Sequence, residues 1–117
     1  MAEAMAITKR PWGWFETLAE GEGYLIKRLW IAPHQRISLQ RHQHRQEHWY
    51  VALGGGSVTI NDQDLEAPIG STFDVPCGSI HRAEAGFEGM LMTLQSKVET
   101  FLVKPILNVW PMTMADK

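Results

Sequence analysis

Five side chains that can coordinate a metal ion lie within nine consecutive positions near the middle of the chain. They are Gln40, His42, His44, Glu47 and His48. Imidazole nitrogens, a carboxylate and an amide oxygen make a mixed nitrogen and oxygen donor set, which suits Zn, Mn, Fe, Co or Ni better than metals that prefer thiolates. The spacing therefore predicts a site for one divalent metal ion, with Zn as the first candidate.

A second segment, from Gly70 to His81, adds one more imidazole beside a turn that contains Pro76 and Gly78. Side chains alternate across a strand, so those of residues 40, 42 and 44 would share one face, and residue 48 would lie opposite Glu47. A strand that brings His81 to this face would complete a polar cage. The alternative is a solvated, polar strand face. Cys77 is either a thiolate ligand or, as we favour, a small buried side chain.

The elements that must position these residues read as strands. Segments rich in β-branched and aromatic residues recur about every 8 to 12 residues, separated by Gly, Pro or Asn-Asp, which is typical of an all-β sandwich or barrel. The expected strands cover residues 24–32, 36–44, 47–53, 57–60, 65–67, 71–75 and 90–94, with another at 100–103. The glycine triplet 54–56 is expected to form a turn after the third of these. Residues 98–102 fit either a strand or a short helix.

Length and composition indicate one soluble globular domain, because the chain has 117 residues, of which 44% are hydrophobic and 21% charged. A net charge of −2 does not favour nucleic acid or a membrane surface as a partner. No apolar run is long enough to predict a transmembrane helix, and the first residues lack the apolar core of a signal peptide. The single cysteine fits a reducing compartment. We therefore expect a cytoplasmic protein.

Five tryptophans is a high number for this length. They could stack on a sugar ring, but we favour a role in the interior or in a dimer contact. Trp49 has the strand parity of Glu47, so the two side chains should point the same way.

The two ligand-bearing segments resemble the two motifs of the cupin superfamily. In the first motif, Gln40, His42, Glu47 and Gly54 fall at the expected positions, with Gln at the first histidine position and His34 where the pattern begins with Gly. In the second motif, Gly70, Pro76, Gly78 and His81 match, and Ala85 replaces an Asn.

Within the cupins, the chain is similar to the C-terminal domain of type II phosphomannose isomerases, which is often fused to a mannose-1-phosphate guanylyltransferase. Arg10-Pro-Trp-Gly-Trp14 looks like the opening motif of that family, and Ser38 to Trp49 is similar to its central signature. The resemblance covers about residues 10–96. The segment 97–117 diverges from the family's usual ending, and the transferase domain is not in this chain, so guanylyl transfer is not expected.

The resemblance implies a single cupin jelly-roll β-barrel, with short or no helices, over residues 1–117. It makes Gln40, His42, Glu47 and His81 the expected metal ligands, with His44 as an alternative ligand or a supporting group. Arg45 matches the family's Arg and is the expected substrate-facing cation. Three other cations are weaker candidates and are expected to be solvated surface charges; they are Lys27, Arg36 and Arg82.

The activity that the resemblance implies is metal-dependent interconversion of aldose and ketose hexose phosphates, as in mannose-6-phosphate isomerase. The expected partners are a small sugar phosphate and, because cupin barrels often pair, a second copy of the chain; the apolar residues of segment 97–117 could cap the barrel or join that copy. Two alternatives stay open, since one fold hosts many activities. The first is a non-catalytic metal- and sugar-binding cupin module, and the second is another small cupin enzyme such as a dioxygenase.

Overall fold

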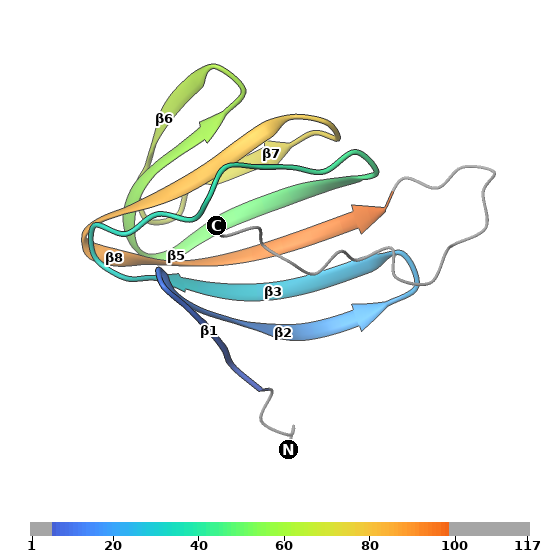
Figure 1. Cartoon of the computed structure of the whole chain (residues 1–117), viewed down its shortest axis with the longest axis horizontal. Coiled ribbons are helices and arrows are strands. Elements are labelled where there is room, and N and C mark those ends of the chain that lie inside the picture. Colours follow the sequence, from blue (N-terminus) through green and yellow to red (C-terminus); the bar gives the residue numbers. More distant parts are fainter. Residues whose placement is uncertain (1–5, 99–117) are drawn as a thin grey trace.

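The computed structural model describes residues 6–98, and within this range the chain forms eight β-strands and no helix (Figure 1). The strands are β1 (Thr8–Arg10), β2 (Gly13–Gly21), β3 (Tyr24–Ile31), β4 (Gln40–Arg41), β5 (Arg45–Ile60), β6 (Gln63–Ala67), β7 (Thr72–Val75) and β8 (Ile80–Val98). The all-β prediction is confirmed. The described part of the chain contains no helix that could span a membrane.

All strand pairs are antiparallel, and the main sheet has the order β1-β2-β3-β8-β5-β6, while β4 pairs with β8 and β7 with β5. The two longest strands, β5 and β8, pair with each other and join the two groups of shorter strands (Figure 1). Among residues 6–98 no ladder joins β1 to β6, so the sheet curls without closing into the hydrogen-bonded barrel that the sequence predicts.

The core lies on the inner face of this curled sheet. β3 shows the alternation directly, because Leu25, Lys27, Leu29 and Ile31 are buried and the residues that alternate with them are more exposed. Trp12 and Trp49 are buried in the core, which confirms the interior role for these two tryptophans. Trp14 and Trp30 are partly buried register partners of β2 and β3, and Trp110 lies outside the described residues.

The sequence predicts a turn at the glycine triplet, but the triplet lies inside β5. A Cβ atom on Gly54 would lie 2.0 Å from the carbonyl oxygen of Gly89, and one on Gly56 would lie 2.0 Å from that of Glu84. Both glycines sit where the register between β5 and β8 shifts. They are therefore required because β8 passes too close for a side chain, and Gly54 also has a positive φ of 69°.

Other strand boundaries also differ from the prediction. The segment 36–44 contains only the short β4 and an isolated bridge between Arg36 and Glu84. β2 and the first half of β8 were not predicted, because neither carries a clear alternation of apolar and polar residues. The expected element at 98–103 falls, apart from Val98 at the end of β8, outside the described residues, as does most of segment 97–117.

His34 has a φ of 63°, in the left-handed region that favours glycine. This is the position at which the first cupin motif begins with Gly. The backbone at position 34 therefore has the conformation that favours the motif's Gly, although this chain has His at that position.

Candidate metal centre

Three strands bring the predicted ligands to the inner face of the sheet. In β5, the side chains of Arg45, Glu47 and Trp49 are buried and alternate with exposed neighbours. Gln40 of β4 and His81 of β8 are register partners, so their side chains project to the same side of the sheet. His42 follows β4 immediately and reaches the same place.

The side chains of His42, Glu47 and His81 form one compact group. Their potential ligand atoms all lie within 4.8 Å of one another. His42 Nε2 is 3.5 Å from Glu47 Oε2, and His81 Nε2 is 4.0 Å from Glu47 Oε1. The side chains of Glu47 and His81 are each 3% exposed and that of His42 is 11% exposed, so this is an interior cage of two imidazoles and one carboxylate rather than a solvated strand face.

Hydrogen bonds orient this group. His81 Nδ1 lies 3.1 Å from the carbonyl oxygen of Ser79, so the proton is held at Nδ1 and Nε2 carries a lone pair. Within residues 6–98 this buried Nε2 has no hydrogen-bond partner. Trp49 Nε1 donates to Glu47 Oε1 at 2.9 Å, which confirms that the two side chains share a face. A buried imidazole nitrogen that lacks a partner and faces a carboxylate is the arrangement expected of a metal ligand.

The electrostatics of the cage keep both imidazoles neutral at neutral pH. Burial, and then the positive charge of Arg45, lower the pKa of His42 to about 3. Burial also lowers the pKa of His81, although Glu47 and the hydrogen bond to Ser79 act in the opposite direction. A neutral imidazole is the form that binds a metal, so no proton has to be removed first.

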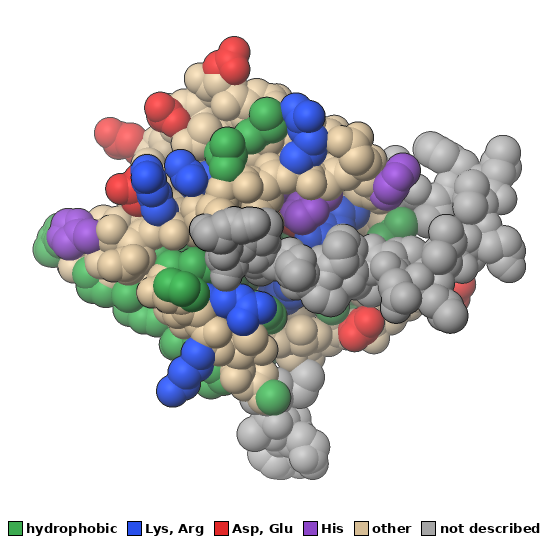
Figure 2. Space-filling view, in the orientation of Figure 1, with side chains coloured by type: hydrophobic (Ala, Val, Ile, Leu, Met, Phe, Trp, Pro, Cys, Tyr) green, Lys and Arg blue, Asp and Glu red, His purple; other side chains and the backbone are tan. Residues whose placement is uncertain are grey.

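Arg45 lies inside the cage and contacts two of its members. Its side chain is buried, Nη2 donates to His42 Nε2 at 2.9 Å, and Nε is 3.4 Å from Glu47 Oε2. In Figure 2 a histidine lies against basic side chains near the centre of the viewed face. The guanidinium therefore bridges the two residues as a cation, and its hydrogen bond to His42 Nε2 has to break if that nitrogen is to bind a metal ion.

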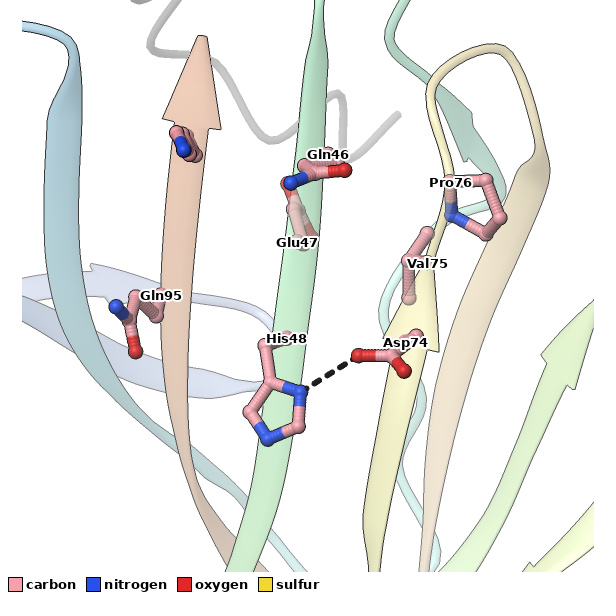
Figure 3. A pocket seen from close by; sticks show the side chains of 8 residues that line it. Gln46, Glu47, His48, Asp74, Val75, Pro76 and Gln95 are labelled. Atoms are coloured by element: carbon pink, nitrogen blue, oxygen red, sulfur yellow. Dashed lines mark hydrogen bonds and ion pairs between the residues drawn. The ribbon is translucent and has the colours of Figure 1, made fainter.

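Two histidines of the sequence cluster lie elsewhere. His44 is exposed and is not part of the group, because residues 42–44 lie between β4 and β5 and strand parity does not apply to them. His48 points to the outer face of β5, where Nδ1 is 2.7 Å from Asp74 Oδ1 of β7 (Figure 3). This pair borders a surface pocket of about 540 Å³ lined also by Gln46 and Gln95.

Cys77 is exposed, so the prediction of a buried side chain is wrong. It follows Pro76 in a turn, where the backbone leaves the sheet and places the side chain at the surface.

Lys27 departs most from what its sequence position predicts. It is 4% exposed and lies on the inner face of β3 between Leu25 and Leu29, so it is not a solvated surface charge. Burial, together with the positive charges of Arg45 and Arg10, lowers its pKa to about 8, against a smaller upward effect of Glu47.

The two arginines that were grouped with Lys27 lie away from the cage. Arg36 is exposed, as expected, whereas Arg82 is partly buried and its Nε donates to the carbonyl oxygen of Ile37 at 3.0 Å. Both line a separate pocket of about 310 Å³ beside Trp12.

A family model described as the C-terminal part of mannose-6-phosphate isomerase matches residues 2–105. The chain belongs to this family. A mannose-1-phosphate guanylyltransferase of Sinorhizobium fredii is 34% identical over 91 residues, which are 78% of this chain and 17% of that protein. The alginate biosynthesis protein AlgA of Pseudomonas aeruginosa is 36% identical over 73 residues, which are 62% of this chain and 15% of that protein. The chain thus spans about a sixth of the length of these relatives.

Solved structures confirm the cupin fold. The cupin domain of Cnp3 from Schizosaccharomyces pombe aligns with a TM-score of 0.74 at 14% identity, over 82% of this chain and 70% of that one. An RmlC-like cupin from Shewanella frigidimarina also gives a TM-score of 0.74, at 19% identity, over 84% of this chain and 87% of that one. At these identities the likeness shows the fold alone. The chain is therefore a cupin of the phosphomannose isomerase and mannose-1-phosphate guanylyltransferase family with a candidate metal-binding group in its interior.

Proposed function

We propose that this cupin is a metal-dependent isomerase that interconverts an aldose and a ketose hexose phosphate, with mannose 6-phosphate and fructose 6-phosphate as the substrate pair. The observation that supports this most directly is the buried group of His42, Glu47 and His81 in a chain of the mannose-6-phosphate isomerase family. The two imidazoles are neutral and the carboxylate is oriented, as metal binding requires.

In this proposal His42, Glu47 and His81 hold one divalent metal ion, with Zn as the first candidate, and the amide of Gln40 completes the set. Their nitrogen and oxygen donors fit such an ion, and Nε2 of His81, which has no hydrogen-bond partner among residues 6–98, is available to it. Such an ion, when bound, would supply a Lewis acid that stabilises negative charge on oxygen atoms of the substrate.

The protein's own residues position the site. The carbonyl of Ser79 fixes the tautomer of His81, and the indole of Trp49 holds one carboxylate oxygen of Glu47. Arg45 is a permanent cation in contact with the cage, so in this proposal it turns toward the substrate, where it attracts the negatively charged sugar phosphate. The buried apolar walls exclude water around these groups, which strengthens their electrostatic effects.

The test combines metal analysis with an isomerase assay. We expect the purified protein to bind one equivalent of a divalent ion and to convert mannose 6-phosphate to fructose 6-phosphate. The variant His42→Ala should lose both properties, because one ligand is removed from the enclosed cage. His44→Ala serves as the matched control, since this histidine is exposed, and it should retain both.

Metal binding without turnover, with the metal lost in His42→Ala, would overturn the isomerase proposal and favour a non-catalytic metal- and sugar-binding module. Turnover that survives complete removal of the metal would overturn the assignment of the cage. Light scattering of the same samples tests the separate prediction of a homodimer.

A further inference from the structure

The two imidazoles of the cage differ in what their Nε2 atoms contact. His81 Nε2 has no hydrogen-bond partner among residues 6–98, whereas His42 Nε2 lies 2.9 Å from Arg45 Nη2. A guanidinium can only donate, so this ring nitrogen is the unprotonated one and its lone pair accepts the hydrogen bond. The same nitrogen faces the cage, 3.5 Å from Glu47 Oε2. The atom of His42 that is placed to bind a metal ion is therefore the atom that accepts from Arg45.

The same guanidinium also contacts the carboxylate of the cage. Arg45 Nε lies 3.4 Å from Glu47 Oε2, and the two side chains are 7% and 3% exposed. The residues are two positions apart on β5, so the strand places both on its inner face. Because little water screens a buried pair, the attraction is stronger than it would be at the surface. Arg45 therefore contacts two of the three side chains of the cage.

A divalent ion and this guanidinium require the same atoms. The one lone pair of a neutral imidazole accepts either a hydrogen or a metal ion, so the ion can bind His42 Nε2 only when the hydrogen bond from Arg45 has broken. The two cations also repel each other, and burial strengthens this repulsion. Both effects have the same sign, because each makes the ion bind less tightly while Arg45 stays in contact with the cage.

We propose that Arg45 is an internal competitor of the metal ion: the guanidinium and the ion bind His42 Nε2 alternately, so Arg45 lowers metal affinity and metal binding moves Arg45 away from the cage. This inference rests on the part of the proposed function that assigns a metal ion to His42, Glu47 and His81, but not on the isomerase activity. It adds a form of regulation to that site, since Arg45 can turn toward a substrate only after its hydrogen bond to His42 has broken.

The competing explanation is that Arg45 supports the metal ligands. A neighbour that orients a ligand normally raises metal affinity, and its removal lowers that affinity. A competitor has the opposite effect, because its removal leaves no hydrogen bond to break and no positive charge to repel the ion. The direction of the change in metal affinity therefore distinguishes the two explanations.

The experiment measures the Kd for Zn²⁺ by calorimetry on metal-stripped protein. Arg45→Met keeps a long side chain but removes the donors and the charge, so the Kd should become about 10- to 100-fold tighter. Arg41→Met is the matched control, because it removes an exposed arginine of β4 with the same change in net charge, and it should leave the Kd unchanged. A weaker or unchanged affinity in folded Arg45→Met, or an equal gain in Arg41→Met, would overturn the proposal.

A second measurement uses the wild-type chain and does not depend on the folding of a variant. Exchange of the Arg45 guanidinium hydrogens with water, followed by NMR, should become faster when Zn²⁺ is added and reach its final rate at one equivalent. Ligand binding that only stabilises the fold has the opposite effect, because it makes local opening rarer. Exchange that stays the same or slows at saturating Zn²⁺ would show that the guanidinium keeps its contacts, which contradicts competition.

These outcomes are separable from those of the isomerase test, because neither measurement involves a sugar. Tighter Zn²⁺ binding in Arg45→Met, together with a wild-type protein that has no isomerase activity, would support the competitor and overturn the isomerase. An active isomerase whose Zn²⁺ affinity falls in Arg45→Met would overturn the competitor and leave the isomerase standing. A wild-type protein and an Arg45→Met variant that both fail to bind Zn²⁺ would overturn the metal site and this inference with it.

Discussion

The two faces of β5 carry similar side chains in opposite environments. On the inner face, Glu47 meets His42 and His81 in an enclosed space. On the outer face, His48 pairs with Asp74 at 2.7 Å, and the two side chains are 48% and 86% exposed. Both regions place an imidazole beside a carboxylate, so the residue types alone do not distinguish them.

Burial is what separates the two regions. Inside, loss of hydration and the nearby cations lower the pKa of His42 to about 3, and a ring nitrogen of His81 has no hydrogen-bond partner in the described part of the chain. Outside, water solvates both members of the pair and screens their attraction. The comparison indicates that the inner face can bind a ligand strongly, whereas the outer pair contributes a solvated surface contact.

The largest expected effect is on metal affinity. Replacing His81 by Asn removes an imidazole whose tautomer and direction are already fixed, so we expect at least about a 100-fold loss of affinity for Zn²⁺. His48→Asn makes the same change on the outer face and should leave the affinity unchanged. Calorimetry with both variants, after circular dichroism has shown that they are folded, measures the difference. Equal losses in the two variants would contradict the distinction between the faces.

The next largest effect is on stability, because the inner face depends on β5 lying close to β8. In Gly54→Ala the new Cβ collides with the backbone of Gly89 and the residue keeps a positive φ, so the free energy of unfolding should fall by about 3 kcal/mol. Gly23→Ala is the control, since Gly23 has a φ of 83° but no atom of residues 6–98 would lie within 4 Å of the added Cβ. It should lose only about 1 to 2 kcal/mol, the cost of the backbone conformation. Urea denaturation of both variants tests this, and equal losses would contradict the close approach.

The sequence predicts the cage better than the elements that form it. The residues Gln40, His42, Glu47 and His81 are identifiable because their spacing matches two motifs, and the structure brings them to one face. The fold class also follows from the recurring strand patterns. That His44 lies outside the cage could not be predicted from the sequence. Its position depends on where β4 ends, and the sequence pattern continues as a strand through that point.

Lys27 and the glycine triplet show why the rest could not be predicted. β3 carries apolar residues on both faces, with Leu25 and Leu29 on one and Ile26 and Trp30 on the other. Strand parity places Lys27 on the face of Leu25 and Leu29, but the pattern does not reveal which of the two faces is buried. Glycines 54–56 have the composition of a turn, and only the passage of β8 explains their place inside a strand.

The pH dependence of stability distinguishes an inner lysine from an outer one. The pKa of Lys27 is about 8 in the folded chain, against the ordinary value of 10.5 that a lysine has in an unfolded chain. Between these pH values the unfolded chain holds a proton that the folded chain has released. The free energy of unfolding should therefore rise with pH across this range, by at most about 1.4 kcal/mol per unit. Lys27→Met should lose this contribution. Lys97→Met, which removes an exposed lysine of β8, should retain it. Denaturation curves from pH 7.5 to 10.5 measure both, and a rise that persists in Lys27→Met would contradict the burial of its charge.

The smallest expected effect is on the outer face. Asp74→Asn removes the charge that faces His48, but both side chains are solvated, so the free energy of unfolding should change by less than about 1 kcal/mol and the change should shrink with added salt. Metal affinity should not change, because Asp74 reaches the outer pocket and not the cage (Figure 3). A large loss of metal affinity in this variant would mean that the two faces of β5 are coupled, since a solvated pair can influence the interior only by moving the strand that carries Glu47.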